Sequence, residues 1–136
     1  MPIEIKETKE IPKEKILALY RSLKWSSAEK PDALYAALMN SHSLISAWDG
    51  EELVGLGNAI TDGYLVVYYP HLLVSPDHQN QGIGTRLVEK LRSKYLGFHS
   101  EIVLADGRAV EFYLRSGFSR AGTTVPLWKY EGKDHG

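Results

Sequence analysis

The chain joins an apolar run, residues 64–74, to an amphipathic one through the stretch Val74-Ser75-Pro76-Asp77-His78-Gln79-Asn80-Gln81-Gly82-Ile83-Gly84-Thr85. The apolar residues that follow are spaced as on one face of a helix; they are Ile83, Leu87, Val88 and Leu91. The pattern therefore predicts a strand, a loop and a helix. The first turn of a helix presents free backbone N–H groups and the positive end of the helix dipole, and glycines beside it let an anion approach the backbone. This stretch is predicted to bind phosphate.

Three kinds of phosphate loop contain glycines of this sort, and the spacing of the glycines separates them. A nucleoside triphosphate loop requires a Lys directly after its last glycine, where this chain has Thr85. A dinucleotide loop requires a third glycine where this chain has Leu87. The third pattern, Gln79-x-x-Gly82-x-Gly84, resembles the pyrophosphate-binding motif of the GCN5-related N-acetyltransferase (GNAT) superfamily. Taken alone, the loop is also compatible with a tight strand-to-helix turn that binds nothing.

Composition limits the kind of protein that this chain can be. Its 136 residues and 43% hydrophobic content are ordinary for one globular domain, so a single domain over residues 1–136 is expected. The chain has no cysteine, which excludes disulfides and a thiolate nucleophile and is compatible with a reducing, cytoplasmic location. The five histidines show no metal-ligand spacing, so no metal is expected.

Charge and hydropathy give no sign of a nucleic-acid or membrane partner. The 16 basic and 17 acidic residues are interspersed, without a basic block or a polybasic amphipathic stretch. The longest apolar run is too short to span a bilayer, and the N-terminus has no signal-peptide character. We therefore expect neither nucleic acid nor a membrane as a partner.

Turn residues and hydrophobic periodicity divide the chain into short elements. Strands are predicted over residues 2–6, 43–48, 52–60, 64–74, 101–104 and 124–130, with a further short strand near 117–121. Helices are predicted from Pro12 to near Trp25, from Pro31 onward, over 83–95 and over 107–116. Residues 132–136 are predicted to be a disordered end. Hairpin strands followed by a β-α-β-α series predict an α/β fold with a mixed, mostly antiparallel sheet and helices on both faces.

A second motif, Ala109-Val110-Glu111-Phe112-Tyr113-Leu114-Arg115-Ser116-Gly117-Phe118, lies in the last predicted helix. By periodicity alone its apolar residues are core residues. The pattern A-x-x-F-Y-x-x-x-G-F, however, resembles the fourth helix of the GNAT superfamily. It follows the glycine loop in the order that this superfamily uses, and the two motifs together cover residues 64–118. The chain is therefore identified as resembling a GNAT acetyltransferase, with the GNAT fold.

The resemblance implies which residues bind acetyl-CoA as the cosubstrate. The backbone of Leu72, Leu73 and Val74 would pair with the pantetheine arm, as an added strand does. The pyrophosphate would be held by the backbone amides of Gln79, Asn80, Gln81, Gly82, Ile83, Gly84 and Thr85. Tyr113 would be the general acid toward the departing CoA thiolate, because a phenol with a pKa of about 10 keeps its proton at neutral pH.

The acceptor half of the site is less defined by sequence. The usual place of the acceptor site in this superfamily implies that it is lined by Trp25, Tyr35, Tyr68, Tyr69 and His71. The superfamily often has a Glu on the fourth strand as the base, and Val66-Val67-Tyr68-Tyr69 contains no acid. His71 and Asp62 are candidates for the base, and a water relay is the default. Asp106 stands where many members have an Asn that contacts CoA, and we expect it to cap the helix instead.

These observations predict an N-acetyltransferase, an acyltransferase that moves acetyl from acetyl-CoA to a primary amine by direct attack in a ternary complex. The absence of cysteine disfavours a covalent Cys intermediate. A small-molecule amine is the expected acceptor, and the resemblance is compatible with a homodimer. The alternative is a non-catalytic module that binds or senses acyl-CoA.

Overall fold

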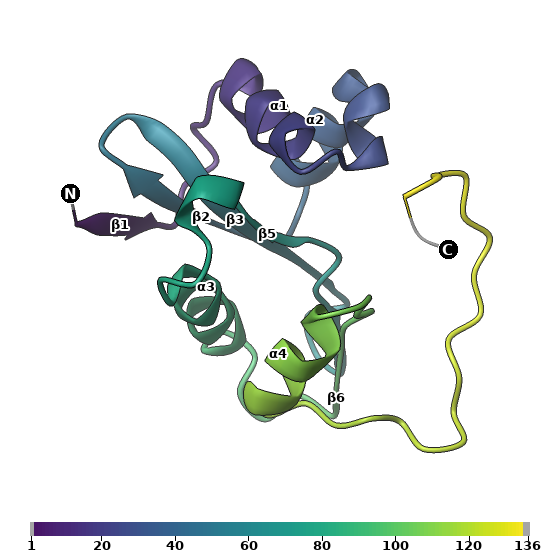
Figure 1. The fold of residues 1–136 in the computed structure, drawn as a ribbon. Coiled ribbons are helices and arrows are strands. Elements are labelled where there is room, and N and C mark those ends of the chain that lie inside the picture. Colours follow the sequence, from purple (N-terminus) through teal and green to yellow (C-terminus); the bar gives the residue numbers. More distant parts are fainter. Residues whose placement is uncertain (1, 135–136) are drawn as a thin grey trace.

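The computed structural model describes residues 2–134, and Figure 1 shows its elements in chain order. The strands are β1 (Ile3–Lys6), β2 (Ser43–Asp49), β3 (Glu52–Thr61), β4 (Val66–Tyr68), β5 (Leu72–Val74) and β6 (Ser100–Ile102). The helices are α1 (Lys13–Ser22), α2 (Pro31–Met39), α3 (Ile83–Arg92) and α4 (Ala109–Arg115). Two short 3-10 turns, η1 (Ser26–Glu29) and η2 (Pro76–His78), complete the list.

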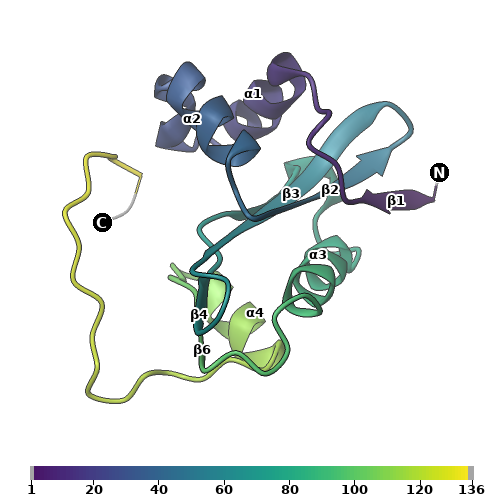
Figure 2. The same ribbon diagram turned by 180° about the vertical axis from the view of Figure 1, so that it is seen from behind.

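One mixed sheet forms the centre of the molecule. Its order is β1-β2-β3-β4-β6, and β5 also pairs with β3. The pairs are antiparallel except for β4 with β6, which are parallel. Helices α1 and α2 lie over one face of the sheet and α3 lies over the other, and Figure 2 shows the same layers from behind. The predicted fold class, a mixed α/β sheet with helices on both faces, is confirmed.

The predicted strand 64–74 is divided into β4 and β5 by a bulge. Ile60 pairs with Tyr68 and Gly57 pairs with Leu72, so two residues of β3 lie opposite three residues, 69–71, of the bulged strand. Pro70 has no backbone N–H to donate, which suits an interrupted position. The backbone N–H of Tyr69 turns to the carbonyl of Ile102 on β6, 3.0 Å away. Beyond this point β4 stays with β6, and β5 continues beside β3 alone.

The core consists of two clusters, one on each face of the sheet. One cluster joins α1 and α2 to the sheet through residues such as Ile16, Tyr20 and Leu38. The other joins α3 to the opposite face through Ile83, Leu87 and Leu91, among others. The helical spacing of residues 83–91 therefore predicted a buried face correctly.

The C-terminal part of the chain differs from the prediction. Residues 124–130 form no strand, and neither do residues 117–121. The segment 119–134 passes outside the body of the protein back toward η1 (Figure 1). A strand requires a neighbour with free backbone groups, and strand-like composition does not supply one. The predicted disorder of 132–136 is wrong for Gly132 to Asp134, which the structure places against η1, and residues 135–136 lie outside the described part.

Helix α3 packs closely on β3 because two positions of that strand are glycines. A Cβ atom on Gly57 would lie 2.8 Å from Leu91 Cδ1 and 3.1 Å from Leu72 Cδ1. Leu91 is buried in the packed interior and Leu72 is partly buried against the same cluster, so Leu91 in particular has little room to move. The close approach of the helix therefore depends on the missing side chain.

We predict that Gly57→Ala lowers the free energy of unfolding by about 1–2 kcal/mol, because the added methyl overpacks this contact. Urea unfolding measures the change. Gly84→Ala is the matched control, because its Cβ would meet nothing nearer than 3.4 Å and it lies in the first turn of α3. Equal destabilisation by the two variants would contradict the packing explanation.

Candidate active site

The bulge gives β5 an edge that no other strand occupies among residues 2–134. Leu72, Leu73 and Val74 pair with Gly57, Leu56 and Gly55 of β3 on one side only. On the other side the backbone groups are available to an extended ligand. The three predicted pantetheine-binding residues therefore lie on an open strand edge.

The glycine loop follows this edge directly and is shaped by left-handed backbone conformations. Asn80 has φ 64° and Gly82 has φ 79°, and Gly82 is the residue from which α3 begins. The side chain of Gln79 folds back to donate to the carbonyl of Val74, at 3.1 Å. The backbone amides of Ile83, Gly84 and Thr85 belong to the first turn of α3, where amides have no partner within the helix. The seven predicted cradle residues thus form one turn at a helix N-terminus.

A histidine fixes the start of this loop. The His78 ring lies between Ser75 Oγ at 3.3 Å and Asp49 Oδ2 at 3.1 Å, so η2 is tied to the β2–β3 hairpin. Asp49, Glu52 and His78 each place one ligand atom within 4.8 Å of the others. The hydrogen bonds of His78 already account for this arrangement, which lies away from the cavity described next.

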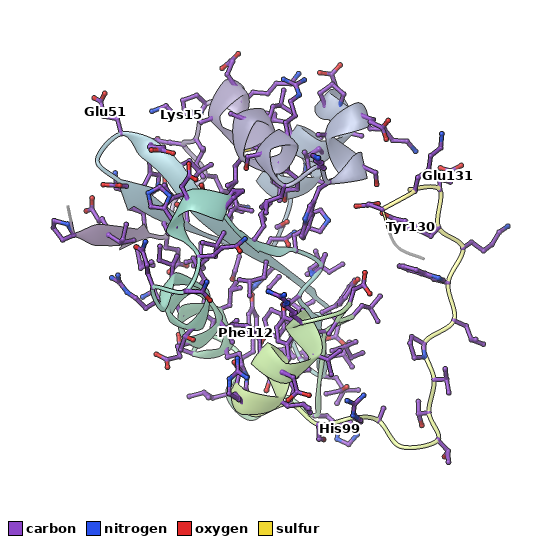
Figure 3. The ribbon with its side chains drawn as sticks, in the orientation of Figure 1. Lys15, Glu51, His99, Phe112, Tyr130 and Glu131 are labelled. Atoms are coloured by element: carbon purple, nitrogen blue, oxygen red, sulfur yellow. The ribbon has the colours of Figure 1, made fainter. Side chains whose placement is uncertain are left out.

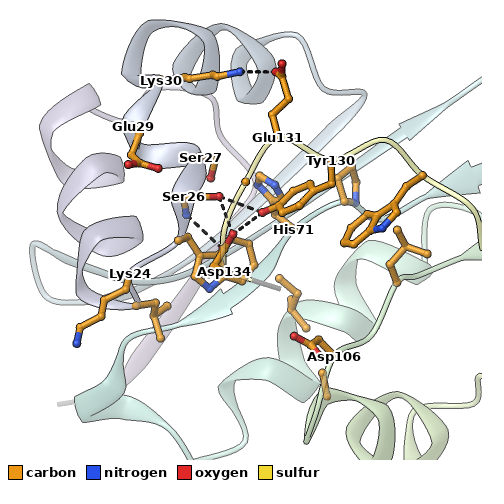
Figure 4. Close-up of a pocket in the computed structure, with 18 of the residues that line it drawn as sticks. Lys24, Ser26, Ser27, Glu29, Lys30, His71, Asp106, Tyr130, Glu131 and Asp134 are labelled. Carbon is orange, nitrogen blue, oxygen red and sulfur yellow. Dashed lines mark hydrogen bonds and ion pairs between the residues drawn. The ribbon is translucent and has the colours of Figure 1, made fainter. Parts of the chain in front are cut away.

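A cavity of about 720 Å³ opens at the end of β5 that is remote from the glycine loop. Figure 4 shows the side chains that line it, which come from four parts of the chain. These parts are η1 with the residues just before it, the β4–β5 bulge, the region from Leu104 to Tyr113, and the C-terminal segment from Trp128 to Asp134. Of the predicted acceptor residues, Trp25, Tyr68 and His71 are present in this lining.

Tyr113 places a phenol at this cavity. It lies on α4 between the rings of Phe112 and Phe118, with ring centroids 5.2 Å and 5.5 Å away, and only 9% of it is exposed. Burial, together with the neighbouring Tyr68, raises the pKa of Tyr113 to about 12. The phenol therefore keeps its proton at neutral pH and can donate a hydrogen bond into the cavity.

His71 is part of the cavity wall and is held as a neutral ring. Its Nδ1 lies 2.7 Å from the hydroxyl of Tyr20, and its ring meets the Trp25 ring edge-on. Burial lowers the pKa of His71 to about 4. Burial also raises the pKa of Tyr20, so the Tyr20 hydroxyl keeps its proton and donates it to Nδ1. The remaining proton of the imidazole then lies on Nε2, which makes His71 a donor rather than a base.

Comparison with known proteins identifies the family. Residues 7–126 match the model of an acetyltransferase (GNAT) domain. The chain is 34% identical over 98 residues to a histone acetyltransferase of Glycine max; the match covers 62% of this chain and 42% of that protein. An acetyltransferase of the GNAT family from Streptococcus pneumoniae TIGR4 has a similar structure, with a TM-score of 0.84 and 28% identity over 96% of this chain and 99% of that one. An aminoglycoside N-acetyltransferase in complex with CoA has the same fold, with a TM-score of 0.73 and 12% identity over 96% and 95% of the two chains.

This chain belongs to the GNAT acetyltransferase family. The chain spans about two fifths of the length of the curated relatives that it matches. No helix among residues 2–134 combines the length and the apolar character that crossing a membrane requires.

Two of the predicted acceptor residues lie elsewhere in this GNAT domain. Tyr35 is partly buried against the cluster beneath α1 and α2. Tyr69 is buried on the α3 face, and its hydroxyl donates to Glu101 Oε1 at 2.7 Å. Ordinary alternation along a strand explains Tyr69, because the neighbouring residues Tyr68 and Tyr69 point to opposite faces of the sheet. Neither tyrosine lines the cavity.

The charged candidates also have structural explanations. Asp62 accepts hydrogen bonds from the backbone of Tyr64, Leu65 and Val66 and so stabilises a turn outside the cavity. Another charged residue, Arg92 of α3, binds Glu101 through two hydrogen bonds of 2.9 Å and also donates to the Ser116 carbonyl, so its guanidinium has a structural role. The prediction that Asp106 caps α4 is wrong: α4 follows Arg108, and Asp106 lies in the cavity wall.

Two parts of the cavity wall were not predicted from the sequence. The first part is η1, a short turn without a periodic pattern, which supplies Ser26, Ser27 and Glu29 and is followed directly by Lys30. Trp128, Tyr130 and Asp134 come from the segment that was predicted to be a strand and a disordered end. Ser26 Oγ donates to Asp134 Oδ1 at 2.7 Å and lies 3.0 Å from the Tyr130 hydroxyl, and Lys30 pairs with Glu131 at 3.0 Å (Figure 4). The aromatic residues near the C-terminus were the available signal for this wall.

We predict that His71 makes the stability of the domain depend on pH. Its folded pKa of about 4 lies below the ordinary value of 6.5, so its contribution is fully present above pH 6.5 and falls as the pH drops toward 4. Between about pH 7 and pH 5 the expected loss in the free energy of unfolding is about 2 kcal/mol. Urea unfolding at several pH values measures this slope.

The control for this prediction is a second histidine. His71→Asn should remove the loss between pH 7 and pH 5, whereas His99→Asn, at an exposed position, should retain it. An unchanged slope in His71→Asn would show that another group titrates.

Proposed function

We propose that residues 1–136 form one N-acetyltransferase domain that transfers the acetyl group of acetyl-CoA to a primary amine of a small molecule. One observation carries this proposal. The open edge of β5 runs from the glycine loop at Val74 to the cavity at Leu72, and Tyr113 lies at the cavity end. An extended thioester that begins at the loop would therefore end beside a phenol.

Acetyl-CoA fits this path through backbone contacts. Its pyrophosphate would accept hydrogen bonds from the amides of residues 79–85, where the helix dipole also favours an anion. The pantetheine arm has an amide spacing suited to the edge of β5, and it would pair there as a short added strand. The family match supports acetyl-CoA as the cosubstrate, and the CoA complex of the aminoglycoside N-acetyltransferase shows that the fold accommodates CoA.

The reaction would proceed by direct attack. The amine nitrogen forms a bond to the thioester carbon, the C–S bond then breaks, and the sulfur leaves as a thiolate. A water chain would remove the amine proton, because His71 is already protonated on Nε2 in our assignment and Asp62 lies outside the cavity. The thiolate takes a proton from solvent as CoA leaves, and this proton replaces the one that the water chain carried from the amine to solvent, so the proton count is balanced.

The environment of Tyr113 defines what it contributes. A thiol has a pKa of about 8.5, well below the value of about 12 for Tyr113. Complete transfer of the phenol proton to the thiolate is therefore uphill. Tyr113 would act mainly by donating a hydrogen bond to the charge that develops on sulfur, a bond that is stronger in the transition state than in the ground state.

The cavity suits an acceptor that carries positive charge. Its lining includes two cations, Lys24 and Lys30, and four carboxylates, Glu29, Asp106, Glu131 and Asp134, so two negative charges remain in excess (four minus two). The C-terminal segment closes one side of the cavity, which favours a compact amine over a folded protein surface. A protein amine is the second candidate, since the Glycine max relative is named a histone acetyltransferase.

We further propose that the domain acts without nucleic acid, membrane or metal, in the cytoplasm, and as a homodimer. The interspersed charges support the absence of a nucleic-acid or membrane partner, and the absence of cysteine excludes Cys-ligated metal and is compatible with a cytoplasmic location. A non-catalytic acyl-CoA sensor is the outcome to which the experiments below would point if binding occurs without turnover.

We predict that Gly82→Ala weakens the binding of acetyl-CoA severalfold to tenfold, because a side chain at φ 79° strains the turn that presents the amides. Isothermal titration calorimetry measures the affinity. Gly63→Ala is the matched control, since Gly63 has φ 86° with equally open surroundings and lies away from the loop. If the wild type binds no acetyl-CoA, the whole proposal fails.

We predict that Tyr113→Phe lowers turnover roughly ten- to hundredfold while the affinity for acetyl-CoA stays unchanged, because the lost hydrogen bond to a charged sulfur is worth about 1.5–3 kcal/mol. The measurement is release of CoA thiol, screened first over mono-, di- and polyamines with the wild type. Tyr64→Phe, at a fully exposed tyrosine, is the control. Normal turnover of Tyr113→Phe would exclude this role, and binding of acetyl-CoA without thiol release for any of the amines would point to the sensor.

A further inference from the structure

Alternation along β5 determines which backbone groups reach its open edge. The His71 carbonyl accepts a hydrogen bond from β3 at 3.2 Å, and the Ser75 amide donates one to β3 at 2.7 Å. Both residues therefore direct their backbone groups toward β3. Because the direction of these groups alternates along a strand, those of Leu72 and Val74 point to the open edge.

The backbone amides beyond Leu72, toward the cavity, are used within the fold or are missing. The Tyr69 amide donates to a carbonyl of β6 at 3.0 Å, and the His71 amide donates to Asn58 Oδ1 at 3.0 Å. Pro70, which lies between them, has no N–H. Leu72 therefore carries the last backbone N–H of the open edge at the cavity end.

An anionic oxygen forms at this end of the edge during acetyl transfer. In the proposed function, on which this inference rests, the amine nitrogen attacks the thioester carbon and the electron pair of the C=O bond moves to oxygen. The pair returns when the C–S bond breaks. Fixed hydrogen-bond donors stabilise such an oxyanion, and a pair of donors is a common arrangement. The backbone here supplies Leu72 at most, so a second donor from the protein has to be a side chain.

The His71 side chain offers this second donor. It precedes Leu72 directly in the chain, and its ring is part of the cavity lining (Figure 4). Its Nδ1 accepts from the Tyr20 hydroxyl at 2.7 Å, which leaves the ring proton on Nε2. No hydrogen bond among residues 2–134 involves Nε2. The N–H group of Nε2 is therefore available to a ligand in the cavity.

The His71 ring is fixed in place by the surrounding fold. The centroid of the Trp25 ring lies 5.2 Å from that of His71, and the centroid of the Tyr20 ring lies 5.5 Å away. Asn58 holds the backbone of His71 through both its amide and its carbonyl. A donor that is held in this way needs no reorganisation when charge develops on the oxygen.

The charge state of His71 also suits this role. Burial lowers the pKa of His71 to about 4, so the imidazole is neutral at pH 7. A neutral ring keeps Nδ1 as an acceptor for Tyr20, and it does not repel the positive charge of an amine that enters the cavity.

Other donors in the lining have other partners or are held less firmly. Tyr113 is assigned to the sulfur, and Lys30 pairs with Glu131 at 3.0 Å. The Tyr68 hydroxyl is the competing donor, because burial raises its pKa and it keeps its proton. Unlike His71, Tyr68 has no side-chain hydrogen bond or ring contact among residues 2–134 that fixes its hydroxyl.

We propose that His71 is a catalytic residue whose Nε2–H donates a hydrogen bond to the thioester carbonyl oxygen, beside the amide of Leu72. The bond strengthens as the oxygen becomes an anion, so it stabilises the transition state more than the ground state. In this role His71 polarises the carbonyl and takes no proton from the amine.

Turnover of three variants tests the role of the donor. His71→Leu removes the donor and should lower kcat about 10²- to 10³-fold. His71→Gln should stay within about tenfold of the wild type, because its amide can accept from Tyr20 and donate into the cavity. His99→Leu is the matched control, since Figure 3 shows His99 below α4, at the end of the molecule opposite to α1 and α2.

The comparison of these variants separates three roles of His71. Glutamine cannot take a proton, so equal losses in His71→Gln and His71→Leu would point to a base and overturn the proposal. A raised KM for the amine with unchanged kcat would point to a contact with the acceptor and also overturn it. A hundredfold loss in Tyr68→Phe, with normal turnover of His71→Leu, would assign the donor to Tyr68 instead.

Nuclear magnetic resonance tests the same contact without a substitution and without acetyl transfer. The ring nitrogens of His71 are observed with ¹⁵N-labelled histidine, and His71→Gln identifies their signals. The free protein should show a protonated Nε2 and an unprotonated Nδ1. Saturating acetyl-CoA should shift the Nε2 signal, whereas CoA, which has no acetyl carbonyl, should not.

The outcomes of this measurement distinguish the inference from the proposed function. A proton on Nδ1 rather than Nε2, or the same Nε2 signal with acetyl-CoA and with CoA, would overturn the role of His71 alone. Failure of acetyl-CoA to bind at all would overturn the proposed function and this role together.

Discussion

The bulge at residues 69–71 is the constraint on which the rest of the site depends. Three residues there lie opposite two of β3, so the strand cannot continue to pair on both sides. Pairing with β6 ends, and the backbone of β5 is left open beside the glycine loop. Without the bulge, β6 would occupy the edge that a pantetheine arm requires. A defect in the ladder is thus what makes the sheet a binding surface.

The same bulge determines which side chains reach the cavity. It reverses the alternation of the strand, so that Tyr68 and His71 lie on the cavity side while Tyr69 points to α3. Asn58 compensates for part of the lost pairing, because its side-chain oxygen accepts from the His71 amide at 3.0 Å and its backbone donates to the His71 carbonyl. His71 is therefore fixed at the backbone as well as at its ring, which lets a neutral imidazole remain buried next to an acidic cavity.

Local sequence predicted the elements whose conformation depends on local chemistry. The glycine loop needs a left-handed residue and a helix start, and Gly82 followed by the spacing of Ile83 and Leu87 specifies both. The face to which each side chain of the bulged strand points depends on the extra residue that this strand has relative to β3. The sequence around Tyr68 and Tyr69 does not by itself reveal that extra residue. The wall from η1 depends on contacts more than a hundred residues apart, such as Ser26 with Asp134. Hydrophobic periodicity therefore could predict neither the faces of the bulged strand nor the part of the wall that comes from η1.

Residues 124–130 show why strand composition and strand formation differ. Val125, Leu127 and Tyr130 favour a sheet, but a β-strand is stable only when a neighbour accepts its backbone groups. The aromatic residues of the segment, Trp128 and Tyr130, line the cavity, whereas its aliphatic residues, Val125 and Leu127, are exposed to solvent. Exposed aliphatic residues leave apolar surface in contact with water, and this contact costs free energy. The position of the segment among residues 2–134 is therefore set by side-chain contacts with η1, such as Ser26 with Tyr130, and the same contacts place Tyr130 in the wall of the acceptor cavity.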